Sequence, residues 1–277
     1  MSDDHRLASW HLNSIAAELQ RRYIDLHQQS GERRKLNIAG VIIAGGRGTR
    51  LGAGEKPLAP FCGRTLLDAI VETVRPQVSA LAIDIRPDAA DAYAAWNERG
   101  LVCLHDPISG NAGPLGGVVA GLEWATALGG TEWLATFPAD TPFLPPTLVG
   151  TLASAAVASR PVVATCGGQI EGLCALWPID FLPRLREGVA SGTFRSVSQT
   201  LTAFGAVQCA IEDPQGFFNI NTPADLAKAE HVAEERGYGA GKGGGDRAAN
   251  PYEPGSPFHA AYDKGWIAGQ RAIAEQM

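Results

Sequence analysis

The chain has 277 residues, of which 33 are glycine and 18 are proline, and its 23 lysines and arginines against 29 acidic residues give a net charge of −6. This balance argues against a protein whose whole surface binds nucleic acid, and no apolar run approaches the roughly 20 residues that span a bilayer. The acidic start of the chain and five scattered cysteines without a C-x-x-C pair are typical of a cytoplasmic protein with reduced thiols, and they indicate neither export nor a zinc site.

Glycine is unevenly distributed. Residues 40–54, 110–121 and 237–245 together hold 17 of the 33 glycines. Clustered glycines between apolar runs mark backbone that turns tightly or approaches a ligand closely. We therefore expect each cluster to have a structural or binding role.

A helix is predicted within an N-terminal extension, residues 1–37. Apolar side chains such as Ile15, Leu19 and Tyr23 recur at spacings of four over residues 7–27, which places them on one helical face. We expect this face to pack on the main domain, and docking to a partner protein is the alternative.

The main domain is expected to span residues 38–230 with an α/β fold. Short apolar runs typical of buried strands alternate with stretches typical of helices. The expected strands are 39–46, 81–85, 101–104, 133–138, 161–165 and 172–177, and the expected helices are 66–77, 88–98, 114–128 and 146–158. This alternation predicts a Rossmann-like three-layer sandwich with a mostly parallel sheet, and a ligand at the carboxyl ends of its strands.

Composition changes again after residue 230. The tail, residues 231–277, begins with a stretch that is too rich in glycine and proline for a packed sheet, and a helical pattern resumes near residue 260. We expect a hinge followed by a small appended helical module, which at about 45 residues can hardly build a large core. Its slight negative charge argues against strong RNA binding.

The loop after the first strand carries the most specific pattern, AGGRGTRLGAGEKPL at residues 44–58. Its five glycines let backbone N–H groups face a phosphate, and Arg47, Arg50 and Lys56 add positive charge. The pattern is neither a Walker P-loop nor a G-x-G-x-x-G fingerprint. Three cations and five glycines directly after a strand favour polyphosphate binding over an incidental surface loop.

Asp84, Asp106 and Asp140 each stand at the end of an expected strand. In a parallel sheet these ends share one rim. A carboxylate there suits Mg²⁺, which takes one or two carboxylates together with phosphate oxygens. Asp140 is the candidate metal ligand, with a turn cap before Pro142 as the alternative. Asp84 and Asp106 are candidates for contacting metal, a ribose or a base.

Two further segments are open to more than one interpretation. The sequence GPLGG at 113–117 opens a predicted helix, where the glycines either expose N–H groups to the ligand or permit close helix packing. In NINTPAD at 219–225, Thr222 is placed as an N-cap with Pro223 at the first helical position. This capping role leaves Asn219 and Asn221 as polar site candidates.

The order of these motifs resembles molybdenum cofactor guanylyltransferase of the nucleotide-diphospho-sugar transferase type. The resemblance covers roughly residues 38–230 and is carried by VIIAGGRGTRLG, EKPL, GPLGGVVAGLEWA, FPADTPFLPP and FFNINTPADLAKAE. It favours the guanylyl over the cytidylyl enzyme of the same cofactor pathway. It implies that Asp140 binds both nucleotide and Mg²⁺. The other GTP-binding positions that it implies are Ile43, Ala44, Gly45, Gly46, Lys56, Asp84 and Asp106.

The chain departs from the family pattern at three places, which together comprise four residues. Glu55 stands where the family usually has Asp, and Asp84 stands where it often has Asn, which bears on base or ribose contacts. Glu171 and Gly172 replace the usual His-Pro, which puts contacts to the pterin in doubt more than contacts to GTP.

The resemblance implies guanylyl transfer, in which the terminal phosphate of Mo-molybdopterin attacks the α-phosphate of GTP and pyrophosphate leaves. Such transfer needs positioning and charge neutralisation more than a protein nucleophile, and this fits Lys56, Arg50 and Asp140 as the catalytic residues. A related nucleotidyltransferase that uses CTP or a sugar phosphate is one alternative. A non-catalytic nucleotide- or cofactor-binding adaptor is the other.

The tail is similar to the ribosome modulation factor family in RGYGAG from Arg236, NPY from Asn250, and Gly265-Trp266. That similarity implies ribosome association. A structural lid and a module that docks molybdoenzyme maturation proteins are the alternatives, and the sequence does not choose among them.

Overall fold

The computed structural model describes residues 36–45, 54–61, 63–107, 113–157, 159–250, 252, 254 and 257–275. The chain divides between Asn37 and Ile38 into two units, and the described residues belong almost entirely to the second, Ile38–Met277. The predicted N-terminal helix therefore lies outside the described residues, as do Gly46, Arg47 and Arg50 of the glycine-rich loop.

A mixed seven-stranded sheet forms the centre of this unit, with the order β5-β4-β1-β6-β8-β7-β9. Only β8 runs antiparallel to its neighbours, and the other strand pairs are parallel. The strands are β1 (Ile38–Ile43), β4 (Ala80–Asp84), β5 (Val102–Leu104), β6 (Trp133–Pro138), β7 (Val162–Cys166), β8 (Gln169–Pro178) and β9 (Val207–Ala210). The predicted α/β fold with a mostly parallel sheet is confirmed.

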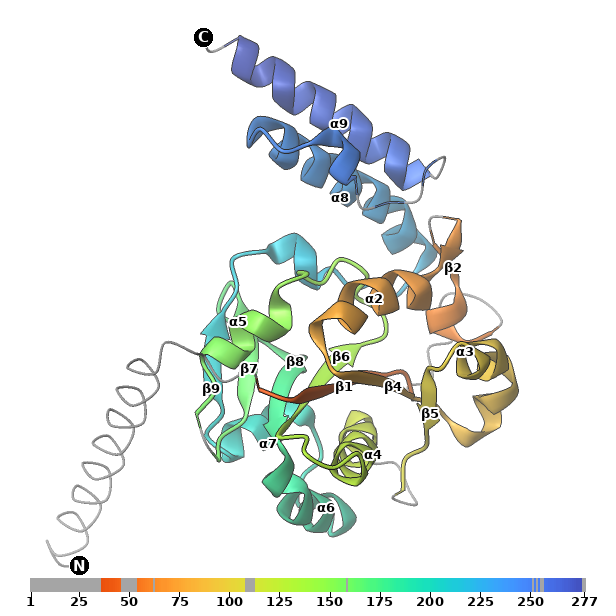
Figure 1. Ribbon diagram of the computed structural model, residues 1–277, viewed down its shortest axis with the longest axis vertical. Helices are drawn as coiled ribbons and strands as arrows, with labels where there is room; N and C mark the ends of the chain where they lie inside the picture. Colours follow the sequence, from red (N-terminus) through yellow and green to blue (C-terminus); the bar gives the residue numbers. More distant parts are fainter. Residues whose placement is uncertain are drawn as a thin grey trace, which may run out of the picture. The chain divides into compact units, whose positions relative to one another are not determined.

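Helices cover both faces of the sheet (Figure 1). On one face lie α2 (Leu66–Val74) and α5 (Leu148–Ser154), and on the other lie α4 (Pro114–Ala127) and α6 (Leu182–Ala190). Among the described residues, no helix combines the length and apolarity that crossing a membrane requires. The shorter elements are η2 (Lys56–Leu58), the hairpin β2 (Pro60–Phe61) and β3 (Arg64–Thr65), η3 (Arg75–Gln77), η4 (Pro87–Tyr93), α3 (Ala94–Glu98), η5 (Ile179–Phe181), α7 (Val197–Ala203), η6 (Pro214–Phe217) and η7 (Arg247–Ala249).

Strand β1 is buried along its whole length because both of its faces are covered. Val41 belongs to the core that α4 closes from one side, together with Leu134 of β6. A Cβ atom added at Gly121 of α4 would lie 2.7 Å from a methyl carbon of Val41 and 2.9 Å from one of Leu134. Glycine at this position therefore lets α4 lie close against the central strands.

The structure contains all six predicted strands and all four predicted helical regions, with shifted ends. The predicted helix at 88–98 is η4 followed by α3, and the helix expected over 146–158 is the shorter α5. Strand β9 and helices α6 and α7 are additional, and none of them was predicted.

Two long helices, α8 (Pro223–Lys242) and α9 (Pro257–Ala274), lie side by side in Figure 1. Most of the tail lies in this helix pair, although α8 begins before residue 231. The helical pattern expected near residue 260 is confirmed by α9. The hinge expected from residue 231 is wrong for 231–242, because α8 continues through residue 230 without interruption. A Cβ atom at Gly237 would lie 1.9 Å from the carbonyl oxygen of Tyr262, so this glycine allows two helices to touch.

Candidate nucleotide-binding site

The centre of the sheet contains a point where the order of strand connection reverses. From β1 the chain moves outward to β4 and β5, and it then returns to the other side of β1 to form β6. Open α/β sheets bind their ligands at such a point, beyond the carboxyl ends of the strands. The segment after β1 leads to Lys56, and Asp140 follows β6. Both predicted residues are therefore placed at the expected position in the fold.

Lys56 connects three segments that are far apart in the sequence. Its Nζ donates to Oδ2 of Asp140 and to Oδ1 of Asn221, each at 2.6 Å. The Lys56 side chain is 14% exposed and that of Asp140 is 27% exposed, so solvent screens this contact only partly. The structure thus brings together the predicted pair Lys56 and Asp140, and it adds Asn221, which the sequence left as a candidate.

Asn221 is positioned by the start of α8. Thr222 is the N-cap, and its Oγ1 accepts from the backbone N–H of Asp225 at 3.2 Å. Oδ2 of Asp225 in turn accepts from the backbone N–H groups of Thr222, at 2.9 Å, and Asn221, at 3.1 Å. The Thr222 hydroxyl also donates to Oδ2 of Asp225 at 2.9 Å, and this bond, followed by the one from the Asn221 N–H, holds the pKa of the Asp225 carboxyl below its ordinary value. This capping box therefore fixes the backbone at the residue that reaches Lys56.

The segment before α8 runs along the Asp140 loop. The backbone N–H of Ile220 donates to the carbonyl oxygen of Asp140 at 2.9 Å. The hydroxyl of Thr141 donates to Oδ1 of Asn219 at 2.7 Å and to Oδ1 of Asp140 at 3.2 Å. Asn219 therefore joins the site through Thr141. Thr141 could not be recognised from the sequence, because a threonine before proline is common in turns.

Glu55, one of the departures from the family pattern, has a partner outside this cluster. Its Oε1 accepts from Nη2 of Arg86 at 2.6 Å. Arg86 lies just after β4, and Glu55 directly precedes η2. The pair therefore links the segment that carries Lys56 to the end of β4.

Asp84 and Asp106 form an acidic pair at the same edge of the sheet. Asp84 is 3% exposed, and its Oδ1 has no hydrogen-bond partner among the described residues. Burial, and secondarily the charge of Asp106, raises the pKa of Asp84 to about 7, although the backbone N–H of Gly45 opposes this effect. The backbone N–H of Ala44 donates to the Asp84 carbonyl oxygen at 2.9 Å. Predicted residues Ala44 and Gly45 therefore contact Asp84.

The second glycine cluster permits a close approach to these two carboxylates. A Cβ atom at Gly117 would lie 2.4 Å from Oδ2 of Asp84, and one at Gly116 would lie 1.9 Å from Oδ2 of Asp106. Both distances are far shorter than any van der Waals contact, so a side chain at either position would force the carboxylate to move. Of the two interpretations of GPLGG, the structure supports close helix packing.

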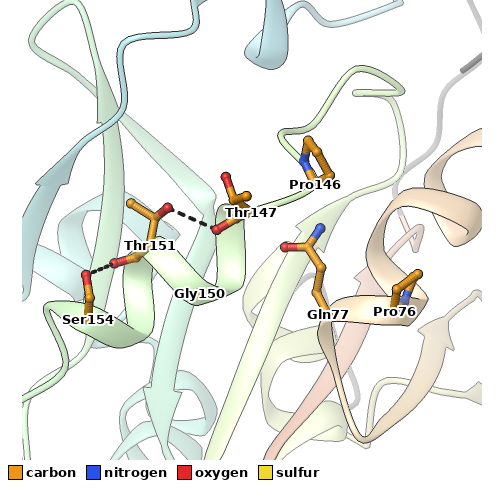
Figure 2. A pocket seen from close by; sticks show the side chains of 7 residues that line it. All are labelled: Pro76, Gln77, Pro146, Thr147, Gly150, Thr151 and Ser154. Carbon is orange, nitrogen blue, oxygen red and sulfur yellow. Dashed lines mark hydrogen bonds between the residues drawn. The ribbon is translucent and has the colours of Figure 1, made fainter. Parts of the chain in front are cut away.

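A separate pocket lies between η3 and α5 (Figure 2). It has a volume of about 480 Å³, and its lining residues are Pro76, Gln77, Pro146, Thr147, Gly150, Thr151 and Ser154. The hydroxyls of Thr151 and Ser154 donate to backbone carbonyls of their own helix, as Figure 2 shows. Because none of the seven lining residues is charged, this pocket is a poorer candidate for a nucleotide than the switch point.

A mostly parallel sheet with a lysine, an aspartate and an asparagine gathered at its switch point defines a protein of the nucleotidyltransferase fold. The crystal structure of molybdopterin-guanine dinucleotide biosynthesis protein A from Archaeoglobus fulgidus is similar, with a TM-score of 0.57, 21% identity, and coverage of 71% of this chain and 99% of that chain. The 4-diphosphocytidyl-2C-methyl-D-erythritol synthase from Anaerococcus prevotii is also similar, with a TM-score of 0.54, 16% identity, and coverage of 70% and 94%. At these identities the likeness establishes the fold.

The sequence profile of the family described as "MobA-like NTP transferase domain" matches residues 40–204, and the chain belongs to this family. It is similar to the molybdenum cofactor guanylyltransferase of Rhodopseudomonas palustris (strain BisB5), with 36% identity over 198 residues that cover 70% of this chain and 92% of that protein. The enzyme of the same name from Acidiphilium cryptum is 41% identical over 198 residues, covering 70% and 94%. The profile ends before the tail, so it gives no support to a ribosome modulation factor there.

Proposed function

We propose that the chain is a molybdenum cofactor guanylyltransferase, which transfers GMP from GTP to Mo-molybdopterin and releases pyrophosphate. The observation that carries this proposal is the Lys56–Asp140–Asn221 cluster at the switch point of a MobA-like NTP transferase domain. Relatives that cover most of that domain bear the name of this activity. We place the reaction in the cytoplasm, where scattered cysteines without a C-x-x-C pair stay reduced.

The site fits a magnesium ion. Oδ2 of Asp140 and Oδ1 of Asn221 both accept from the Lys56 ammonium at 2.6 Å, so the two oxygens lie close together, and Mg²⁺ would take them as Lys56 turns to the phosphates. Carboxylate and amide oxygens suit Mg²⁺, which completes its shell with water and phosphate oxygens. We therefore assign Asp140 as a metal ligand and Asn221 as a second one. A metal ion bound there would neutralise charge on the reacting phosphates.

The protein's own part in the reaction is to hold and neutralise the phosphates. A phosphate oxygen of Mo-molybdopterin forms a bond to the α-phosphorus of GTP, and the bond from that phosphorus to the bridging oxygen breaks as pyrophosphate leaves. Lys56 is placed to donate to phosphate oxygens, and we assign Arg50 the same role from the glycine-rich loop. Charges that are fixed before the reaction begins cost no reorganisation when the transition state forms.

The nucleoside of GTP is assigned to the neighbouring end of β1. Ile43, Ala44 and Gly45 lead from that strand toward Asp84, and we assign Gly46, the next residue in the sequence, to the same nucleoside. With a pKa of about 7, the Asp84 carboxyl is substantially protonated near neutral pH. A protonated carboxyl has one donor and one acceptor, as an asparagine amide does. A protonated Asp84 can therefore make the hydrogen bonds of the asparagine that the family often has at this position.

The proposal is tested by measuring pyrophosphate release from GTP with Mg²⁺ and Mo-molybdopterin. Asp140→Asn keeps the size of the side chain but removes its charge, and we expect it to reduce turnover by about 100-fold or more. Asp91→Asn changes an exposed aspartate in the same way and should leave the rate unchanged. If Asp140→Asn and Asp91→Asn both react at the wild-type rate, the assignment of the site is wrong.

The related alternatives give different results in the same assay. A cytidylyl or sugar-phosphate nucleotidyltransferase would release pyrophosphate with CTP or with a sugar phosphate as acceptor. A non-catalytic adaptor would bind nucleotide and release none.

A further inference from the structure

The α8–α9 helix pair contacts the two segments that carry Lys56 and Asp140. Phe61 of β2 lies a few residues after Lys56, and the ring of Phe258 in α9 packs against it with centroids 4.7 Å apart. Phe143 lies three residues after Asp140, and its ring is 5.9 Å from that of Phe61 in an edge-to-face arrangement. One aromatic residue of the tail is thus in contact with a pair of rings that joins both segments.

Tyr252, which lies between α8 and α9, completes this aromatic cluster. Its ring centroid is 6.3 Å from that of Phe143 and 6.0 Å from that of Phe258. Phe61 and Phe143 are each 3% exposed, and they share one apolar core with Tyr252 and Phe258. Aromatic pairs with such geometry contribute beyond the apolar area that they bury. The tail therefore supplies two of the aromatic rings that pack around the two site segments.

Arg236 of α8 adds a polar contact to the same loop. Its Nη2 donates to the carbonyl oxygen of Phe143 at 2.9 Å and to Oδ2 of Asp213 at 3.0 Å. Its guanidinium also lies over the Phe143 ring, 5.3 Å from the centroid. Backbone and side chain of Phe143 are therefore both held by α8.

The two helices of the tail are tightly fixed to each other. A Cβ atom at Gly265 of α9 would lie 1.9 Å from the carbonyl oxygen of Glu234, and one at Gly269 would lie 2.3 Å from that of Tyr238. Backbone contact this close leaves no room for one helix to slide past the other. Thr222, the N-cap of α8, directly follows Asn221, so the helix pair is also joined to the site through the residue that contacts Lys56.

We propose that the α8–α9 helix pair, together with Tyr252, is a brace that sets the separation of Lys56 and Asp140, with Phe258 and Tyr252 as positioning residues for the transfer reaction. The proposal rests on the proposed guanylyl transfer for its kinetic test. The physical reason is that reacting groups must be held at the correct distance and orientation. A misplacement of a catalytic group by about 1 Å can cost about 100-fold in rate. Neither positioning residue needs to contact a substrate.

The test compares Phe258→Ala with Phe181→Ala in the full chain. Phe181 is a matched control, because it is 5% exposed and its ring lies 4.7 Å from that of Phe204. It belongs to the core that α4 closes, which contains Val41 and Leu134, and not to the aromatic cluster of the tail. We expect Phe258→Ala to lower kcat by about tenfold or more, with the KM for GTP changed by less than about threefold. Phe181→Ala should lower the melting temperature to a similar extent and change kcat by less than about threefold. Phe258→Leu should restore most of the rate. If Phe258→Ala does not fold, Tyr252→Ala removes the other ring of the tail and should lower kcat in the same way.

Hydrogen exchange provides a readout that does not depend on activity. In Phe258→Ala, backbone amides of residues 56–61 and 140–143 should exchange faster than in the wild type, whereas in Phe181→Ala they should not. Equal effects of the two variants on kcat and on exchange at these segments would overturn the brace. Absence of transfer by the wild-type protein would instead refute the proposed function, and the exchange comparison would still decide on the brace.

Discussion

Asp84 is expected to make the folded protein less stable as the pH rises from 5 to 8. Its carboxyl has an ordinary pKa of 3.8 when the chain is unfolded, and burial raises that pKa to about 7 in the folded state. The folded state therefore binds this proton more tightly. The stabilising contribution is complete below pH 3.8 and is lost as the pH rises through about 7.

The size of the effect follows from the two pKa values. A change from 3.8 to about 7 corresponds to a total on the order of 4 kcal/mol, at about 1.4 kcal/mol for each tenfold change in proton affinity. About 2.5 kcal/mol of this total falls between about pH 5 and pH 8. Asp84→Asn removes the titration but keeps the size of the side chain, so it should remove this loss. Its amide nitrogen can also donate toward the neighbouring Asp106 carboxylate.

Urea denaturation at pH 5 and at pH 8 measures the effect directly. The free energy of unfolding of the wild type should fall by about 2.5 kcal/mol more than that of Asp84→Asn over this range. Asp91→Asn, which changes an exposed aspartate, should follow the wild type. Parallel pH profiles for the wild type and Asp84→Asn would refute the inference that Asp84 is protonated in the folded state near neutral pH.

Three further substitutions test the packing and capping described above, each by urea denaturation. Gly117→Ala should lower the free energy of unfolding by about 1–3 kcal/mol, because its Cβ atom would lie 2.4 Å from Oδ2 of Asp84. Gly150→Ala should raise it by about 0.5–1 kcal/mol, because this glycine lies in α5 with nothing within 4 Å of the added atom. Equal effects of these two variants would mean that close packing at α4 is not the reason for glycine there. Thr222→Ala should cost about 1 kcal/mol through loss of the N-cap of α8, and an unchanged midpoint would contradict that role.

Much of the fold could be predicted because its signals are local. Buried parallel strands appear as short apolar runs, and the loop after the first of them carries its glycines and cations within fourteen residues. The same reasoning places Asp84, Asp106 and Asp140 at one edge of the sheet. Which acids pair depends on strand order, and the adjacency of β4 and β5 brings Asp84 to Asp106.

Other parts of the site depend on contacts between distant residues. Asn221 and Lys56 are 165 positions apart, and only the return of the chain to the switch point brings them together. The sequence located Asn221 through the adjacent helix cap, but it did not identify its partner.

The tail shows how one local signal can have two physical causes. Glycine suits both a flexible hinge and a close contact between helices. Gly237 and Gly241 serve the second purpose, because a Cβ atom on either would lie within 2.2 Å of a carbonyl oxygen of α9. The residues that they contact, Tyr262 and Trp266, are each 25 positions away along the chain, so the sequence around these glycines could not distinguish the two causes.

The most direct test of guanylyl transfer is the mass of the product formed when the full chain receives Mo-molybdopterin, Mg²⁺ and equal concentrations of GTP and CTP. We expect the guanine dinucleotide of the cofactor, with pyrophosphate released in equal amount and little cytosine product. The cytosine dinucleotide as the main product, or no dinucleotide at all, would contradict the proposed function.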